Sequence, residues 1–148
     1  RAVDGSEAAL DLAMQGAVAS GVVEKFETQK GDAFAQLSAL AEAGEKFGLV
    51  ICDPPAFASS KSALEAGLRA YEKVARLAAH LVEDGGFLIL CSCSHAADLV
   101  KFRTACNRGI GRAGRSAQLF HTGFAGADHP LHPQLAESGY LKALFYRL

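Results

Sequence analysis

The clearest chemical feature of this sequence is a carboxylate followed by two prolines, Asp53-Pro54-Pro55, directly after the apolar run 49–52. A short apolar run with β-branched residues is typical of a strand buried on both faces, as in a parallel sheet covered by helices. Pro54 lacks an N–H and favours an extended Asp53, so the chain leaves the sheet there and holds the carboxylate at the strand end. Because open α/β sheets bind ligands at this edge, we expect Asp53 to bind a substrate.

A second candidate group is the thiol of Cys93, which lies just past another apolar run, 87–91. Ser94 is placed to cap a helix that begins near His95, and a helix N-terminus stabilises a thiolate. Cys93 is therefore a candidate nucleophile. The alternative is a small buried apolar residue, the commoner state of a free cysteine, which fits the other three cysteines better: Cys52, Cys91 and Cys106.

A metal site is another chemistry that Cys91 and Cys93, followed by His95, could support. The sequence offers no second Cys/His pair at ligand spacing, so we predict no bound metal. His129 and His132 lie beside prolines in an expected loop over residues 123–138. We interpret that loop mainly as a proline-rigidified structural connection.

These groups need elements that hold them, and the sequence predicts strands and helices in alternation, which is typical of a parallel α/β sheet. Ser6 and Asp32 are placed to cap the first two helices, and Gly21 is placed to end the first. The expected strands cover residues 2–4, 22–28, 49–52, 87–91, 115–122 and 139–147. The expected helices cover residues 6–21, 32–41, 61–82 and 95–107.

Residues 109–114 match the glycine pattern of dinucleotide-binding proteins letter for letter. That pattern binds pyrophosphate only after a strand and before a helix, where helix N–H groups meet the phosphates. Here it follows an expected helix and precedes an expected strand. We therefore interpret residues 109–114 as a flexible connection.

The composition limits the class of protein. With 148 residues, of which 50% are apolar, the chain can form one domain over residues 1–148. It shows no signal-peptide pattern and no apolar stretch near the roughly 20 residues of a membrane span. Its four cysteines lack the spacing of a disulfide framework, which favours reduced thiols in the cytoplasm.

Charge is uneven along the chain, although the formal net charge is only −1. Residues 101–148 hold seven Lys/Arg against two Asp/Glu, whereas residues 1–50 hold four against eight. Most of the positive excess lies in one acid-free stretch: Lys101, Arg103, Arg108, Arg112 and Arg115. This stretch could contact phosphate groups, and a solvated helix end and loop is at least as good an interpretation.

The element order and four motifs together resemble the class I S-adenosylmethionine-dependent methyltransferases. Within them, the chain is most similar to the bacterial 23S rRNA cytosine-5 methyltransferases. Their pattern has an Asp-Pro-Pro-x-Phe loop, a Ser-Cys-Ser strand end, and late Asp-His-Pro and Tyr-Leu-Lys segments, which stand here at 53–57, 92–94, 128–130 and 140–142. The resemblance implies a Rossmann-like methyltransferase sheet, S-adenosylmethionine as cofactor, RNA and above all rRNA as partner, a cytoplasmic location, and no membrane association.

The resemblance also implies roles for single residues. Cys93 would add to C6 of a cytosine and activate C5. Asp53 would be a second catalytic residue, which binds the base and also the cofactor. Asp4 would bind the cofactor ribose and Asp32 would lie beside its adenine; the alternative for both is a local role at a helix start. The implied substrate-binding residues are Pro54, Pro55, Phe57 and His129, with loop packing as the alternative role of Phe57.

One departure concerns the start of the chain. The resembled family opens its catalytic domain with a strand and a glycine-rich turn that cradle the cofactor, after an N-terminal RNA-binding domain. This sequence opens at what corresponds to the second strand, so we expect a fragment that lacks the first, central strand and binds the cofactor very weakly alone. Two other functions stay open: amino methylation of adenine or guanine guided by Asp53, and a non-catalytic module for RNA binding or homodimerisation.

Overall fold

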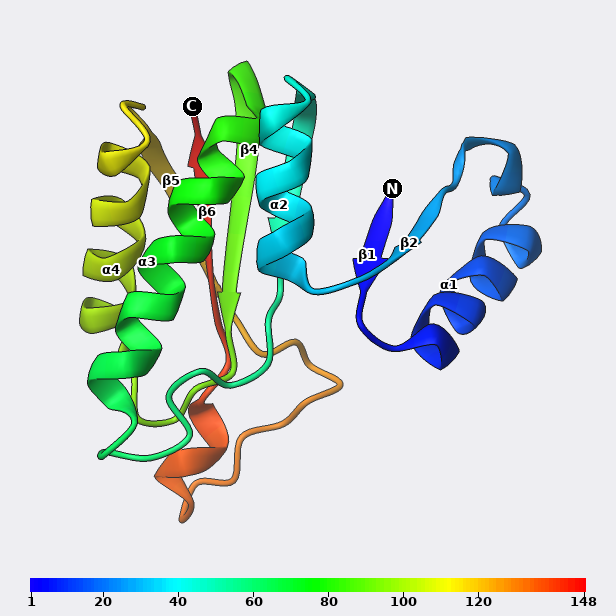
Figure 1. The fold of residues 1–148 in the computed structure, drawn as a ribbon. Helices are drawn as coiled ribbons and strands as arrows, with labels where there is room; N and C mark the ends of the chain where they lie inside the picture. The colour runs from blue at the N-terminus through cyan, green and yellow to red at the C-terminus, as the bar shows by residue number, and fades with distance from the viewer. The chain divides into compact units, whose positions relative to one another are not determined.

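The computed structural model describes the backbone of residues 1–148 and all side chains except those of residues 136 and 137. The chain divides into two compact units, residues 1–43 and residues 44–148. Figure 1 shows the elements of both, and each unit is described by itself.

The first unit is a two-stranded parallel sheet with two helices. Strand β1 (Ala2–Asp4) pairs with β2 (Thr28–Lys30), and α1 (Glu7–Ala19) connects the two strands. Helix α2 (Ala33–Glu42) follows β2. The side chain of Ser6 accepts a hydrogen bond from the N–H of residue 9, and that of Asp32 from the N–H of residue 35, which confirms both expected helix caps.

The strand expected over residues 22–28 is wrong in most of its length. Gly21 has a φ of 68°, and the N–H of Val22 bonds the carbonyl of Ala17, so Val22 still belongs to the turn that closes α1. The short 3₁₀ helix η1 (Val23–Lys25) comes next. Closure of the preceding helix therefore overrides the β-propensity of the two valines, and the strand begins only at Thr28.

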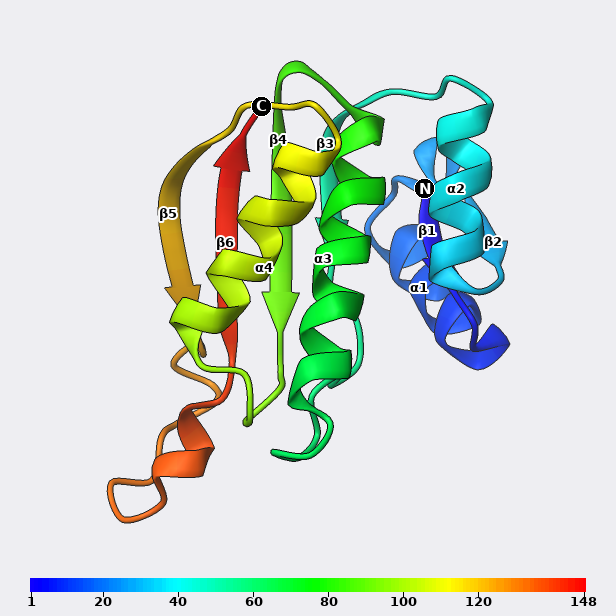
Figure 2. The same ribbon diagram turned by 60° about the vertical axis from the view of Figure 1, so that its left-hand side comes forward.

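The second unit is built on a four-stranded sheet in the order β3-β4-β6-β5. Its strands are β3 (Phe47–Cys52), β4 (Val82–Ser92), β5 (Gln118–Phe124) and β6 (Lys142–Arg147). Strands β3 and β4 are parallel, and β6 is antiparallel to both β4 and β5. The carboxyl ends of β3, β4 and β5 therefore share one edge of the sheet, as Figure 2 shows.

Helices α3 (Leu64–Leu81) and α4 (Leu99–Arg112) cover one face of this sheet (Figures 1 and 2). The largest buried side chains of the unit come from these helices and from the strands beneath them: Tyr71, Leu81, Leu88, Phe102, Leu144 and Tyr146. On the opposite face Leu49 is 51% exposed and Ile51 59% exposed. The expectation that these strands are buried on both faces is therefore wrong for this unit, because α3 and α4 both pack on the same side.

Helix α4 also differs from the expected helix over residues 95–107. Its N-cap is Asp98, whose side chain accepts from the N–H of Lys101, and the helix continues to Arg112. Residues 109–112 are thus the last turn of a helix and not a flexible connection. The rejection of a dinucleotide site at the glycine pattern is unaffected, because the pattern still does not follow a strand.

Across the described residues, no helix combines the length and the apolar character that a bilayer span requires.

Candidate active site

Two neighbouring strand ends bring the expected nucleophile and the proline segment together. Strand β3 ends at Cys52 and β4 at Ser92, so Asp53 and Cys93 each follow a strand at the same sheet edge. The Sγ of Cys93 lies 3.9 Å from the carbonyl oxygen of Pro54, to which its S–H can donate. Residues that are 39 positions apart in the sequence thus meet in one place.

Asp53 is exposed at this edge. Its charge also acts on the adjacent thiol of Cys91, whose pKa is raised to about 11, first by burial and then by the carboxylate. A solvent-facing carboxylate on a rigid segment is suited to accept hydrogen bonds from a ligand.

The remaining thiols are held in their protonated form. Burial raises the pKa of Cys52 to about 12 and raises that of Cys106 well above its usual range. Both therefore behave as small apolar residues near neutral pH. Cys93 differs from them in position, because it lies beyond the end of β4 and is half-buried.

A buried hydroxyl network holds both neighbours of Cys93. Ser92 is 1% exposed and Ser94 is fully buried, and both side chains reach the hydroxyl of Tyr71, at 2.8 Å and 2.7 Å. The Oγ of Ser94 also accepts from the N–H of Ala58, at 2.9 Å. The loop after the prolines is thereby joined to the loop that carries Cys93.

This network corrects the expected role of Ser94. Its hydroxyl bonds tertiary partners, and α4 begins only at Leu99, with Asp98 as its N-cap. Cys93 consequently does not lie at a helix N-terminus.

A positively charged group near Cys93 is the ammonium ion of Lys142, a residue that was not expected at the site. Lys142 lies on β6, opposite Ser92 of β4, and is 8% exposed. Its Nζ donates to the carbonyl oxygens of Ser94 and Tyr140, both at 2.9 Å. Burial lowers the pKa of Lys142, and the nearby Cys93 and Asp98 oppose this shift. A sequence signal was present, since a lysine directly before the apolar run 143–146 of a strand needs buried partners.

Phe57 lies on the same loop and packs against the helix layer. Its ring centroid is 5.0 Å from that of Tyr71. The next residue, Ala58, is fully buried, and a Cβ on Gly67 of α3 would come within 2.7 Å of the Phe57 carbonyl oxygen. The structure thus gives Phe57 a packing role, and base stacking by its ring stays a prediction.

The histidine loop follows β5 at the same sheet edge as Asp53 and Cys93, as the strand directions require (Figure 2). His129 is exposed, and its ring makes an edge contact with Tyr140, with centroids 5.8 Å apart. Among the described side chains, no group of three His, Cys, Asp or Glu residues is arranged to hold a metal ion.

The two expected cofactor carboxylates lie together in the first unit. Asp4 ends β1, and Asp32 follows the paired strand β2 by two residues. The Oδ1 of Asp4 accepts from the N–H of Ser6, at 2.7 Å, and the Oδ1 of Asp32 caps α2. Both carboxylates are therefore fixed by local bonds that use one oxygen each, and both stand at the carboxyl edge of their sheet.

Known proteins resemble the chain strongly in sequence. It is 36% identical over 146 residues to the ribosomal RNA large subunit methyltransferase I of Aeromonas salmonicida, which covers 98% of this chain and 37% of that relative. The protein of the same name from Photobacterium profundum is 38% identical over 141 residues, or 95% of this chain and 36% of that relative. The chain is therefore homologous to a part of each of these two proteins. No family model matches it.

Solved structures confirm the methyltransferase fold. A protein from Streptococcus mutans described as a SAM-dependent methyltransferase superposes with a TM-score of 0.82 at 17% identity, over 99% of this chain and 37% of that one. A methyltransferase structure in complex with SAH gives the same TM-score over 38% of its own chain. TrmN from Thermus thermophilus gives 0.57 over 35% of its chain.

The present chain spans little more than a third of the length of these relatives. The α/β methyltransferase class and the family resemblance expected from the motifs are both confirmed.

Proposed function

We propose that the full-length protein is a cytoplasmic, S-adenosylmethionine-dependent RNA methyltransferase that methylates C5 of a cytosine in 23S rRNA. The observation that carries this proposal is the half-buried thiol of Cys93, 3.9 Å from the carbonyl oxygen of Pro54 at the shared strand edge. The printed names of the relatives support ribosomal RNA as the substrate class.

Cys93 acts as the nucleophile. Its thiolate forms a C–S bond to C6 of the ring, which moves electron density to C5, where the methyl group is accepted. Loss of the C5 proton to a base then breaks the C–S bond and returns the thiolate. Lys142 supports this cycle, because its buried ammonium ion attracts the negative charge on Cys93 and fixes the carbonyl of Ser94.

Asp53 and its neighbours orient the base. The exposed carboxylate accepts a hydrogen bond from the cytosine amino group, while Pro54 and Pro55 keep the segment rigid. A cytosine inside a helix must be extruded to reach the thiol, and Phe57 and His129 lie on the loops that follow β3 and β5, at the sheet edge where it would enter.

The carboxylates of the first unit fit the cofactor. A ribose presents two hydroxyl donors, and Asp4 and Asp32 each keep an acceptor oxygen beyond the one in its local bond. When bound, S-adenosylmethionine would supply an electrophilic methyl group, and the thioether S-adenosylhomocysteine would be the leaving group.

RNA that contains 5-fluorocytosine tests the proposal, because fluorine at C5 blocks release of the enzyme. We expect the full-length protein to form an RNA adduct that survives denaturation, Cys93→Ser to form none, and the matched control Cys91→Ala to form it still. If Cys93→Ala keeps near wild-type turnover, the cytosine-5 assignment fails and amino methylation guided by Asp53 replaces it.

A further inference from the structure

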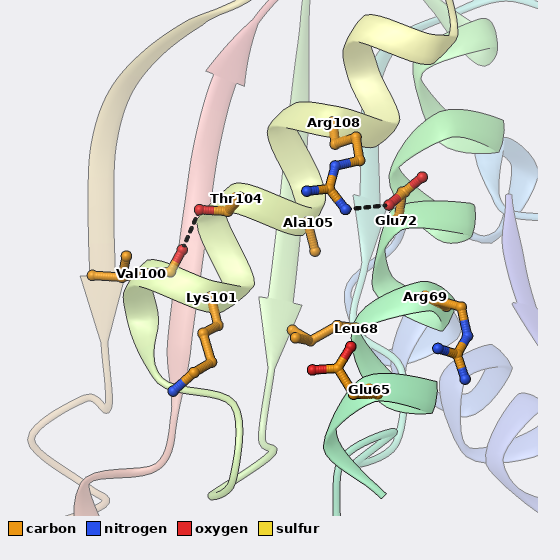
Figure 3. Close-up of a pocket in the computed structure, with 9 residues that line it drawn as sticks. All are labelled: Glu65, Leu68, Arg69, Glu72, Val100, Lys101, Thr104, Ala105 and Arg108. Atoms are coloured by element: carbon orange, nitrogen blue, oxygen red, sulfur yellow. Dashed lines mark hydrogen bonds and ion pairs between the residues drawn. The ribbon is translucent and has the colours of Figure 1, made fainter.

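Basic side chains of α3 and α4 line a groove between the two helices. The helices lie side by side on the sheet (Figure 2). A hollow of about 300 Å³ lies between the N-terminal halves of the two helices. A second hollow of about 470 Å³ overlaps it and reaches Arg76 on α3 and Arg112 on α4. Figure 3 shows the first hollow, with Leu68 and Ala105 on its walls. The basic residues that line this α3–α4 groove are Arg69, Lys73, Arg76, Lys101, Arg108 and Arg112.

Gly109 makes this arrangement possible. A Cβ at this position would lie 2.3 Å from the carbonyl oxygen of Glu72 and 2.8 Å from the Cβ of Ala75. Only a glycine lets the two backbones approach so closely. The close approach brings the basic side chains of both helices onto one surface.

More basic than acidic side chains line the groove, even when Lys73, which has an interaction of its own, is left aside. Glu72 is 8% exposed, and its single carboxylate binds both Arg108, at 3.4 Å, and Arg112. The side chains of these arginines are still 59% and 64% exposed, so guanidinium donors remain available to a ligand. The other acids at the groove are Glu65 and, paired with Lys101, Asp98.

The groove also starts at the candidate active site. Helix α3 follows the loop that carries Asp53, and α4 follows the loop that carries Cys93, so both N-termini lie at the same sheet edge (Figure 2). Lys101 and Arg112 are eleven residues apart on α4, or about 16 Å along its axis. That span exceeds the Debye length of about 8 Å at physiological salt, so one small anion cannot interact with the basic groups at both ends of the groove.

We propose that the α3–α4 groove binds the phosphodiester backbone of the RNA strand that leaves the active-site edge. Arginine guanidinium groups match phosphate oxygens in geometry and charge, and an extended polyanion reaches both ends of the groove. The choice of RNA rests on the proposed function. Arg115 does not belong to the groove, because its guanidinium donates to the carbonyls of Ala79 and Val82.

Binding of fluorescein-labelled oligouridylate to the full-length protein over a KCl series tests the groove. We expect Arg108→Gln and the double variant Arg69→Gln/Arg76→Gln to bind several-fold more weakly at low salt. The slope of log K against log salt should become shallower by about 0.7 for each phosphate group that the variant no longer neutralises. Arg103→Gln is the matched control, because it removes the same charge from α4 outside the groove. In Arg108→Gln, Glu72 keeps its bond to Arg112, and a thermal melt checks folding.

The groove proposal is overturned if these variants bind oligouridylate like Arg103→Gln at every salt concentration; an acidic protein surface would then be the better partner. Adduct formation with 5-fluorocytosine RNA separates this proposal from the methyltransferase assignment. If the wild type forms no adduct but the groove variants bind RNA more weakly than it does, the methyltransferase assignment is contradicted and the groove proposal is supported. Groove variants that still form the adduct at saturating RNA support a binding role alone.

Discussion

The hydroxyl group of Tyr71 lies 2.7 Å from the Oγ of Ser94 and 2.8 Å from the Oγ of Ser92. One phenol on α3 therefore contacts both neighbours of Cys93. Because Tyr71 is 2% exposed, water cannot easily replace this contact. The position of the thiol thus depends on a helix that carries no reacting group.

Tyr71→Phe tests this dependence. The substitution keeps the ring but removes the bonds of its hydroxyl to two buried serines, so we expect a loss of about 1–3 kcal/mol of stability. Alkylation of Cys93 by iodoacetamide should also change in rate. Tyr146→Phe is the control, because its hydroxyl bonds Asn107, at 2.8 Å, away from the thiol. Equal alkylation rates in both variants would argue against a positioning role for Tyr71.

Gly67→Ala tests the packing of the loop after the prolines. The added methyl group would lie 2.7 Å from both the Ala58 Cβ and the Phe57 carbonyl oxygen, so the loop must shift. We expect a loss of about 1–3 kcal/mol in urea unfolding, together with weaker adduct formation. Gly111→Ala on α4 meets no atom within 4 Å and should instead stabilise by about 0.5–1 kcal/mol. Similar signs for both variants would contradict the close approach at Gly67.

Lys142→Met tests the buried ammonium ion. Methionine keeps much of the aliphatic volume and removes the cost of burying a charge, which lowers the pKa of Lys142. The carbonyls of Ser94 and Tyr140 lose their donor, so we expect a loss of at most about 1–3 kcal/mol of stability. The Cys93 thiolate also loses a nearby positive charge. We therefore expect slower iodoacetamide alkylation of Cys93 at neutral pH. An unchanged rate would remove Lys142 from the mechanism.

Alkaline pH should destabilise the second unit through its buried thiols. Burial raises the folded-state pKa of Cys52 from an ordinary 9.0 to about 12. The unfolded chain therefore loses this proton first, so the contribution is complete below pH 9 and is lost as pH rises toward 12. The slope for one thiol is at most about 1.4 kcal/mol per pH unit. Urea midpoints of Cys52→Ala under reducing conditions should fall less steeply over this window than those of wild type.

Local signals in the sequence were sufficient for some elements. Ser6 and Asp32 cap their helices as expected, because each bonds an N–H three residues ahead and needs no distant partner. The meeting of Cys93 with the proline segment was also predictable, since adjacent parallel strands end at one edge.

Other features depend on tertiary partners that the sequence does not announce. Ser94 and Asp98 are both good helix caps, and the choice of Asp98 follows only from the bonds of Ser94 to Tyr71 and Ala58. Lys142 was missed for a similar reason, because its partners are backbone carbonyls on other segments.

The face of the second sheet that α3 and α4 leave open sets a practical limit on biochemical work. Leu49, Ile51, Phe87 and Phe120 are 43–59% exposed there, and β3 is an edge strand of its sheet. Clustered apolar side chains beside an unpaired strand edge promote aggregation. Residues 44–148 produced alone would thus tend to aggregate. Ile51→Lys would improve their solubility more than any substitution near Cys93.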